Sequence, residues 1–167
     1  MRTILAVDDD QNDLFLLERT LCLGGIEHRL LTAGDGVEAE MLLDSIEGGK
    51  DATLPSLVFL DVHMPRLDGL QLLDRLKRQP RRAGIPVVML SSFDDPRDMD
   101  KAFELGADAC LHKPPAPKEV RRLVNSLTDT PRQLQAATAR TGCSTLPFGS
   151  QDAVRHVANS QPRPLGA

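Results

Sequence analysis

The chain has 167 residues, of which 41% are hydrophobic and 3% are aromatic, and its formal net charge is −4 at pH 7. This length fits one domain with a further segment, and the scarcity of aromatic residues argues against a stacking platform for single-stranded nucleic acid. The net negative charge also argues against binding to a phosphate backbone, so we expect no nucleic-acid partner.

Cysteine use and hydrophobicity bear on where the protein works. The three cysteines, Cys22, Cys110 and Cys143, are scattered and match neither a metal-binding spacing nor a disulfide framework. The first apolar run, residues 4–7, is too short for the core of a signal peptide. No apolar run approaches the roughly 20 residues that a membrane span needs. We therefore expect a cytoplasmic protein that does not contact a membrane.

Short apolar runs, several of them rich in β-branched residues, alternate with amphipathic helical patterns along the first 127 residues. Each run has the length and composition of a buried strand. In chain order the predicted strands cover residues 3–7, 28–33, 57–60, 87–90 and 109–112.

A helical pattern follows each of these runs. Apolar residues recur three or four positions apart, and glycine or proline ends most of the patterns. The Asp95-Pro96 pair predicts the N-cap and first turn of the fourth helix. In chain order the helical patterns are Leu14, Leu17 and Leu21; residues 37–46; Leu70, Leu73 and Leu76; Met99, Ala102 and Phe103; and Val120, Leu123, Val124 and Leu127.

The alternation of strands and helices predicts the fold class. Strands that are apolar throughout indicate a parallel sheet with both faces covered by helices. Right-handed crossovers then favour an α/β fold with a doubly wound five-stranded parallel sheet. The periodicity does not give the order of the strands in that sheet.

Residues 128–167 differ from the rest in composition, with four prolines and many threonine, serine, glutamine and alanine residues. We expect residues 1–127 to form one domain and residues 128–167 to be a disordered tail. Because no DNA-binding motif follows Leu127, we do not expect a transcription factor.

Polar side chains follow four of the predicted strands. In an open parallel sheet, ligands bind beyond the carboxyl ends of the strands. The residues at these ends are Asp8 and Asp9, Asp61, Ser91 and Lys113. Two carboxylates about 4 Å apart repel by roughly 4 kcal/mol at an effective dielectric of 20. Such a group therefore needs a protonated member or a bound cation.

All-oxygen ligands favour a hard cation, and Mg²⁺ more than Zn²⁺. A carboxylate beside a divalent ion, with an ammonium and a hydroxyl nearby, is suited to forming an acyl phosphate. The sequence therefore predicts that Asp61 reacts with a phosphoryl group, although an aspartate after a strand is more often a cap or a turn residue.

The segments ILAVDDD, VFLDVHMPRLDG, VVMLSS and CLHKP occur in this order. Together they resemble the receiver domain of bacterial two-component response regulators, in the CheY-like superfamily. The resemblance covers about residues 2–127 and implies a flavodoxin-like sheet in the order 2-1-3-4-5. It implies a single-domain response regulator whose Asp61 accepts a phosphoryl group from a sensor histidine kinase. Such a protein is not an enzyme, apart from slow self-dephosphorylation.

The resemblance also implies a Mg²⁺ site. Asp9, Asp61 and the backbone carbonyl of His63 would bind the ion directly, and Asp8 would act mostly through a metal-bound water. The imidazole of His63 is not an expected ligand, because Mg²⁺ prefers oxygen.

The resemblance implies a switch as well. Ser91 would be the hydroxyl that moves onto the phosphoryl group, and Lys113 would pair with the phosphoryl oxygens. The Lys113–Pro114 bond is commonly cis in such domains. Cys110 departs from the family pattern, which has an aromatic residue three positions before the lysine, so the output must be reported differently.

Two further features bear on the lifetime and type of the regulator. Phe93 and His63 flank the expected phosphoryl entrance, and a bulky Phe93 would hinder the hydrolytic water, which predicts a long-lived phospho-Asp61. Residues 79–84 and the Ser91-Ser92 pair resemble stand-alone receivers of the phytochrome-associated kind.

Output is expected through protein contacts. The candidates are a histidine phosphotransfer protein, a homodimer through the fourth helix, fifth strand and fifth helix, or docking on a target. One alternative is a receiver-like interaction module that is not phosphorylated. A second is a phosphatase with a nucleophilic aspartate, but such enzymes usually carry an aspartate where this chain has His63.

Overall fold

The computed structural model describes residues 1–49, 53–92 and 96–129. Five parallel strands form one sheet in the order β2-β1-β3-β4-β5, which confirms the expected flavodoxin-like arrangement. The strands are β1 (Arg2–Val7), β2 (His28–Ala33), β3 (Leu57–Asp61), β4 (Val87–Ser91) and β5 (Ala109–His112).

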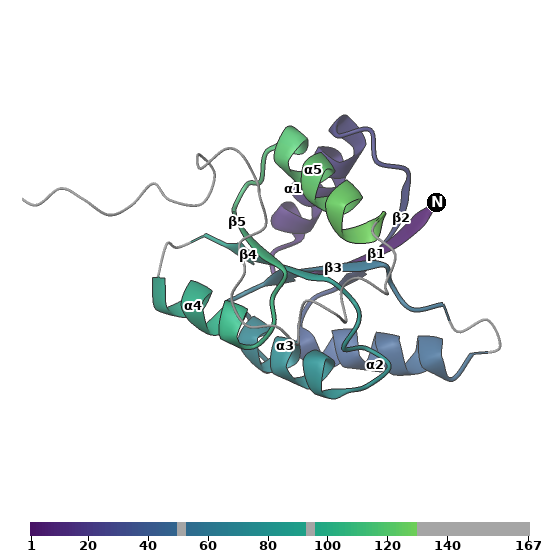
Figure 1. Ribbon diagram of the computed structural model, residues 1–167, viewed down its shortest axis with the longest axis vertical. Coiled ribbons are helices and arrows are strands. Elements are labelled where there is room, and N and C mark those ends of the chain that lie inside the picture. Colours follow the sequence, from purple (N-terminus) through teal and green to yellow (C-terminus); the bar gives the residue numbers. More distant parts are fainter. Residues whose placement is uncertain (50–52, 93–95, 130–167) are drawn as a thin grey trace, which may run out of the picture. The chain divides into compact units, whose positions relative to one another are not determined.

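Five helices cover the two faces of this sheet, with α1 and α5 on one face and α2, α3 and α4 on the other (Figure 1). Their bounds are α1 (Gln11–Leu23), α2 (Gly36–Glu47), α3 (Gly69–Arg78), α4 (Pro96–Glu104) and α5 (Pro117–Thr128). All ten predicted elements are therefore present. In the part of the chain that the structure describes, no helix is long and apolar enough to cross a membrane.

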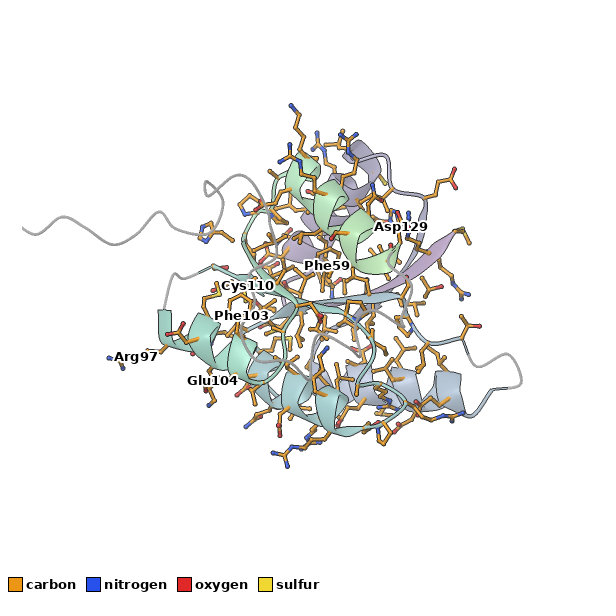
Figure 2. All side chains as sticks on the ribbon, viewed as in Figure 1. Phe59, Arg97, Phe103, Glu104, Cys110 and Asp129 are labelled. Atoms are coloured by element: carbon orange, nitrogen blue, oxygen red, sulfur yellow. The ribbon has the colours of Figure 1, made fainter. Side chains whose placement is uncertain are left out.

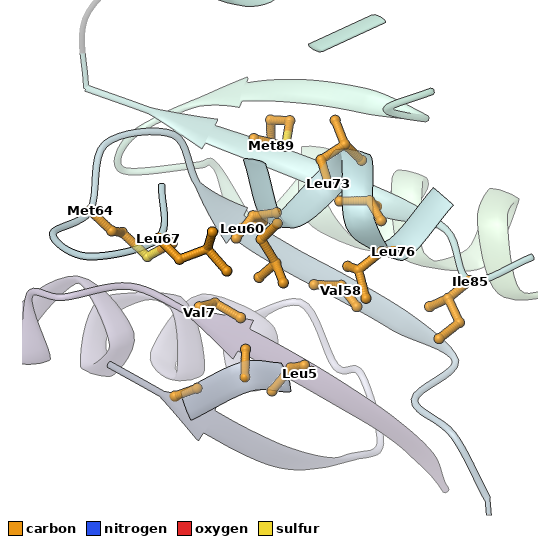
Figure 3. Packing of buried hydrophobic residues seen from close by; sticks show 14 of the residues in the cluster. Leu5, Val7, Val58, Leu60, Met64, Leu67, Leu73, Leu76, Ile85 and Met89 are labelled. Carbon is orange, nitrogen blue, oxygen red and sulfur yellow. The ribbon is translucent and has the colours of Figure 1, made fainter. Parts of the chain in front are cut away.

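The strands are apolar throughout because each supplies side chains to two separate cores. Ile4 and Ala6 belong to the core beneath α1 and α5. Leu5 and Val7 belong to the core beneath α2, α3 and α4, where they lie with residues of β3 and β4 (Figure 3). Alternation of side chains along a strand thus buries both of its faces.

Aspartates cap three of the helices at the end of the sheet where the strands stop. Asp10 accepts a hydrogen bond from the Asn12 backbone N–H at 2.8 Å, and Asp68 forms a capping box with Gln71. Asp35 is 1% exposed, caps α2 and pairs with Arg66. These caps satisfy backbone donors that each first turn leaves free, and they fix where the helices begin.

Some sequence predictions lie outside the described residues. They concern the Asp95 cap of α4, the side chain of Phe93, Cys143 and all but the first two residues of the 128–167 segment. The disordered tail therefore stays a prediction.

Gly69 allows the close approach between the start of α3 and the end of β3. A Cβ atom added there would lie 1.9 Å from the backbone oxygen of Asp61. We expect Gly69→Ala to lower the free energy of unfolding by about 3 kcal/mol and the Tm by roughly 10 °C, because the backbone must move apart. Thermal unfolding followed by circular dichroism measures the change.

Gly84→Ala is the matched control, since an added Cβ there meets nothing within 4 Å. We expect it to change stability by no more than about 0.5 kcal/mol. Equal Tm values for the two variants would contradict the packing argument.

Candidate functional site

Three carboxylates gather where β1 and β3 end. Asp8 and Asp9 follow β1, and Asp61 is the last residue of β3. One oxygen from each lies within 4.8 Å of the others. Asp8 is 3% and Asp61 5% exposed, whereas Asp9 is exposed. The parallel topology thus brings together residues that are more than fifty positions apart in the chain.

Lys113 supplies the positive charge at this cluster. It follows β5, its bond to Pro114 is cis, and its side chain is 9% exposed. The Nζ atom lies 2.5 Å from Asp8 Oδ2 and 2.7 Å from Asp61 Oδ1. The ammonium therefore donates to two carboxylates that would otherwise repel each other without compensation.

Asp13 is a fourth carboxylate, which the sequence analysis did not identify. Its Oδ2 lies 3.0 Å from the Nζ of Lys113. It stands in the first turn of α1, four residues after Asp9. A helix that begins just after the acidic pair turns its first residues back toward the same rim, and that spacing was the available signal.

The positive charge of Lys113 does not fully balance the negative charges of the cluster. Burial raises the pKa of Asp61 and that of Asp8 above the ordinary aspartate value, although the hydrogen bond from Lys113 opposes both shifts. Burial lowers the pKa of Lys113, but hydrogen bonds to Asp61, Asp8 and Asp13 outweigh it and leave that pKa raised. Lys113 thus stays charged at neutral pH, yet it does not fully compensate the acids.

The cluster fits a hard divalent cation. Asp8, Asp9 and Asp61 offer only oxygen ligands at mutually close positions. Lys113 contributes one positive charge against these three carboxylates and Asp13. An excess of converging negative charge in a partly buried site favours binding of a cation with oxygen ligands.

The other predicted site residues take different positions around the cluster. His63 lines the same hollow as the carboxylates, and so does Ser92. Ser91 is only 1% exposed, at the end of β4, and its carbonyl accepts a hydrogen bond from the Lys113 backbone N–H at 2.9 Å. This backbone hydrogen bond places Ser91 beside Lys113. The role of the Ser91 hydroxyl stays a prediction.

Cys110 occupies the position on β5 where the family pattern has an aromatic residue. It pairs in register with Met89 of β4 and packs against the core that includes Ala102 of α4 (Figure 2). Burial raises the pKa of its thiol to about 11. A small, partly buried thiol therefore stands between the sheet and α4.

Comparison with known proteins agrees with this geometry. Residues 4–125 match the family model described as the response regulator receiver domain. The chain is 34% identical to the probable transcriptional regulator ycf27 of Cyanophora paradoxa, over 89% of this chain. The chain spans 57% of the length of that relative.

Two solved structures are similar in fold and sequence. The phosphorylated cyanobacterial phytochrome response regulator RcpA has a TM-score of 0.62 and 26% identity, over 88% of this chain and 99% of that one. The Mn²⁺-bound form of response regulator Rcp1 has a TM-score of 0.62 and 27% identity, over 89% of this chain and 100% of that one.

Neutralising Asp61 should stabilise the fold in the absence of metal. Burial and neighbouring acids raise its pKa, so the charged form costs free energy that Asp61→Asn removes. We expect the variant to gain about 1 kcal/mol and roughly 4 °C in Tm near neutral pH, with a chelator present. Asp74→Asn, which removes a carboxylate paired with Arg78 on the surface of α3, is the control.

The pH dependence follows from the same shift. Protonation of Asp61 stabilises the wild-type fold fully below the unfolded pKa, and this stabilisation is lost as the pH rises through the raised folded pKa. The advantage of Asp61→Asn should therefore be largest near neutrality and shrink as the pH falls. A variant that is less stable than wild type at neutral pH would contradict the electrostatic account.

Cys110 should react slowly with alkylating agents near neutral pH. Its pKa of about 11 keeps the thiol protonated, and the thiolate is the reactive species. We expect alkylation at least about tenfold slower than that of the exposed Cys22, in a Cys143→Ser background. Peptide mass spectrometry over a time course measures both rates, and equal rates would show that Cys110 is not buried as described.

Proposed function

This chain belongs to the response regulator receiver domain family, and on that premise we propose that Asp61 accepts a phosphoryl group from a sensor histidine kinase. The observation that carries the proposal is the shared ammonium: Lys113 Nζ lies 2.7 Å from Asp61 Oδ1 and 2.5 Å from Asp8 Oδ2. A buried carboxylate held beside an ammonium and two further acids has the groups that an acyl phosphate needs.

In the proposed reaction, a carboxylate oxygen of Asp61 attacks the phosphorus of a phosphohistidine. A bond from that oxygen to phosphorus forms while the phosphorus–nitrogen bond breaks, and the electron pair leaves with the imidazole. Lys113 then pairs with the phosphoryl oxygens instead of the free carboxylate. Charge on the transferring group is stabilised by this fixed ammonium, which is already in place before the reaction.

Mg²⁺ is the proposed cofactor, with Asp8, Asp9, Asp61 and the His63 carbonyl around it. The oxygen-only cluster of the three aspartates supports it, and Rcp1, a similar protein, has been solved with Mn²⁺ bound. When bound, the ion would neutralise negative charge on the phosphoryl oxygens. The phosphoryl group would otherwise enter a site that already carries an excess of negative charge.

The proposed output starts from Ser91 and Lys113. Phosphorylation adds a charge of about −2 at Asp61, which would draw the Ser91 hydroxyl and the Lys113 ammonium toward it. This would shift the equilibrium between two arrangements of the face made by α4, β5 and α5. Homodimerisation through that face, or relay to a histidine phosphotransfer protein, would carry the signal onward.

We further propose that residues 1–127 are the receiver and residues 128–167 a tail. The similarity to a phytochrome response regulator supports a histidine kinase as the partner. A receiver-like interaction module without phosphorylation is the rival, and the intact set of Asp61, Ser91 and Lys113 counts against it.

Incubation with acetyl phosphate and Mg²⁺ tests the first step. We expect intact-mass spectrometry to show one added phosphoryl group on the wild-type chain and none on Asp61→Asn, because the amide is a poor nucleophile. Asp74→Asn, on the surface of α3, should be labelled like wild type. Labelling of the Asp61→Asn variant at the wild-type level would refute the assignment.

The phosphorylated state should also be long-lived, with a half-life of minutes or more in the purified protein. The reason is the bulk of Phe93, which the family resemblance predicts beside the entrance for the hydrolytic water. Loss of the added mass over time, after removal of acetyl phosphate, gives the rate. A half-life of seconds would contradict this proposal while leaving Asp61 as the acceptor.

A further inference from the structure

A side-chain contact joins the loop after β3 to helix α4. The Nε2 atom of His63 lies 3.1 Å from the Oδ2 atom of Asp98. His63 stands two residues after Asp61 and lines the hollow that contains the carboxylate cluster. Asp98 stands in the first turn of α4. The contact therefore reaches from the rim of the proposed metal site to a helix of the proposed output face.

The distance between the two side chains fits a hydrogen bond from His63 to a carboxylate. A distance of 3.1 Å between Nε2 and Oδ2 lies within the range for an N–H donor and an oxygen acceptor. Both the imidazolium and one neutral tautomer carry a hydrogen on Nε2, so the bond does not require a charged imidazole. The side chains of His63 and Asp98 are 57% and 26% exposed, so water screens the contact in part.

The residues on either side of His63 limit how its loop can move. Val62 is 2% and Met64 8% exposed, and the carbonyl of Val62 accepts a hydrogen bond from Gly69 at 3.0 Å. Side chains packed in a dense core resist displacement. The backbone is therefore anchored on both sides of His63, and His63 is the exposed residue between the two anchors.

We propose that Asp98 is a positioning residue for the metal site, and that it acts through His63. The inference rests on the proposed function, in which the backbone carbonyl of His63 is a metal ligand. The bond to Asp98 holds the imidazole, and with it the orientation of this carbonyl. Groups that hold metal ligands in place commonly contribute strongly to metal affinity.

The same contact would couple cation binding to α4 without involving β5. By thermodynamic linkage, if the His63–Asp98 bond strengthens cation binding, then cation binding strengthens the bond by the same factor. The first turn of α4 would then be more ordered with the cation bound. This route matters because β5 has Cys110 where the family pattern has an aromatic residue.

Mg²⁺ affinity in a double-mutant cycle tests the proposal. We expect Asp98→Ala, which removes the acceptor, to weaken Mg²⁺ binding about tenfold, as measured by isothermal titration calorimetry on the full chain. In a His63→Ala background, which keeps the carbonyl, the same substitution should have no further effect. Asp100→Ala is the matched control, because it removes an equal charge from an exposed position on the same helix.

Hydrogen exchange gives a second readout that a general structural role would not move. Mg²⁺ should slow amide exchange in the first turn of α4 in wild type and in Asp100→Ala, but not in Asp98→Ala. The inference is overturned if Asp98→Ala binds Mg²⁺ like wild type. It is also overturned if the loss is equal with and without His63, because Asp98 would then act only by its charge.

The same experiment distinguishes failure of the proposed metal site from failure of the proposed role of Asp98. If wild type binds no Mg²⁺ at millimolar concentration, then the proposed metal site is wrong and this inference falls with it. If wild type binds Mg²⁺ but Asp98→Ala makes no difference, only the role of Asp98 is wrong.

Discussion

The site depends on one ammonium shared among several buried or half-buried carboxylates. Lys113 donates to Asp8, Asp61 and Asp13, while Asp9 adds a further negative charge at the rim. The lysine keeps its charge, yet the pKa values of Asp8 and Asp61 stay raised because burial outweighs it. Such a cluster stores unfavourable electrostatic free energy, and a cation or a rearrangement of Lys113 around a phosphoryl group would relieve it.

The fold holds this arrangement because five parallel strands end at the same edge of the sheet. Two hydrophobic cores, one on each face, fix the strands, and aspartate caps fix the starts of α1, α2 and α3. The glycine at the start of α3 lets that helix approach the end of β3. Stability therefore comes from the body of the domain, while the rim is free to carry destabilising charge.

The sequence was sufficient for the elements and for most of the rim. Apolar runs and helical spacing are local signals, and Asp8, Asp9, Asp61 and Lys113 each follow a recognisable strand. The order of the strands is not a local property and came only from resemblance to a family. Contacts between distant side chains had no local signal either, as with His63 and Asp98.

A buried arginine away from the site shows the same limit. Arg82 is 1% exposed and pairs with Asp44 and Glu47 at 2.5 and 2.9 Å. An arginine is normally expected at the surface, and only the fold brings two acids from α2 to it.

The central claim is that Asp61 is the phosphoryl acceptor. Its most direct test is to incubate the protein with acetyl phosphate and Mg²⁺ and then to reduce the acyl phosphate with borohydride. Peptide mass spectrometry then maps the homoserine that this reduction produces. The account predicts homoserine at position 61 alone, and homoserine at another aspartate, or at none, would contradict it.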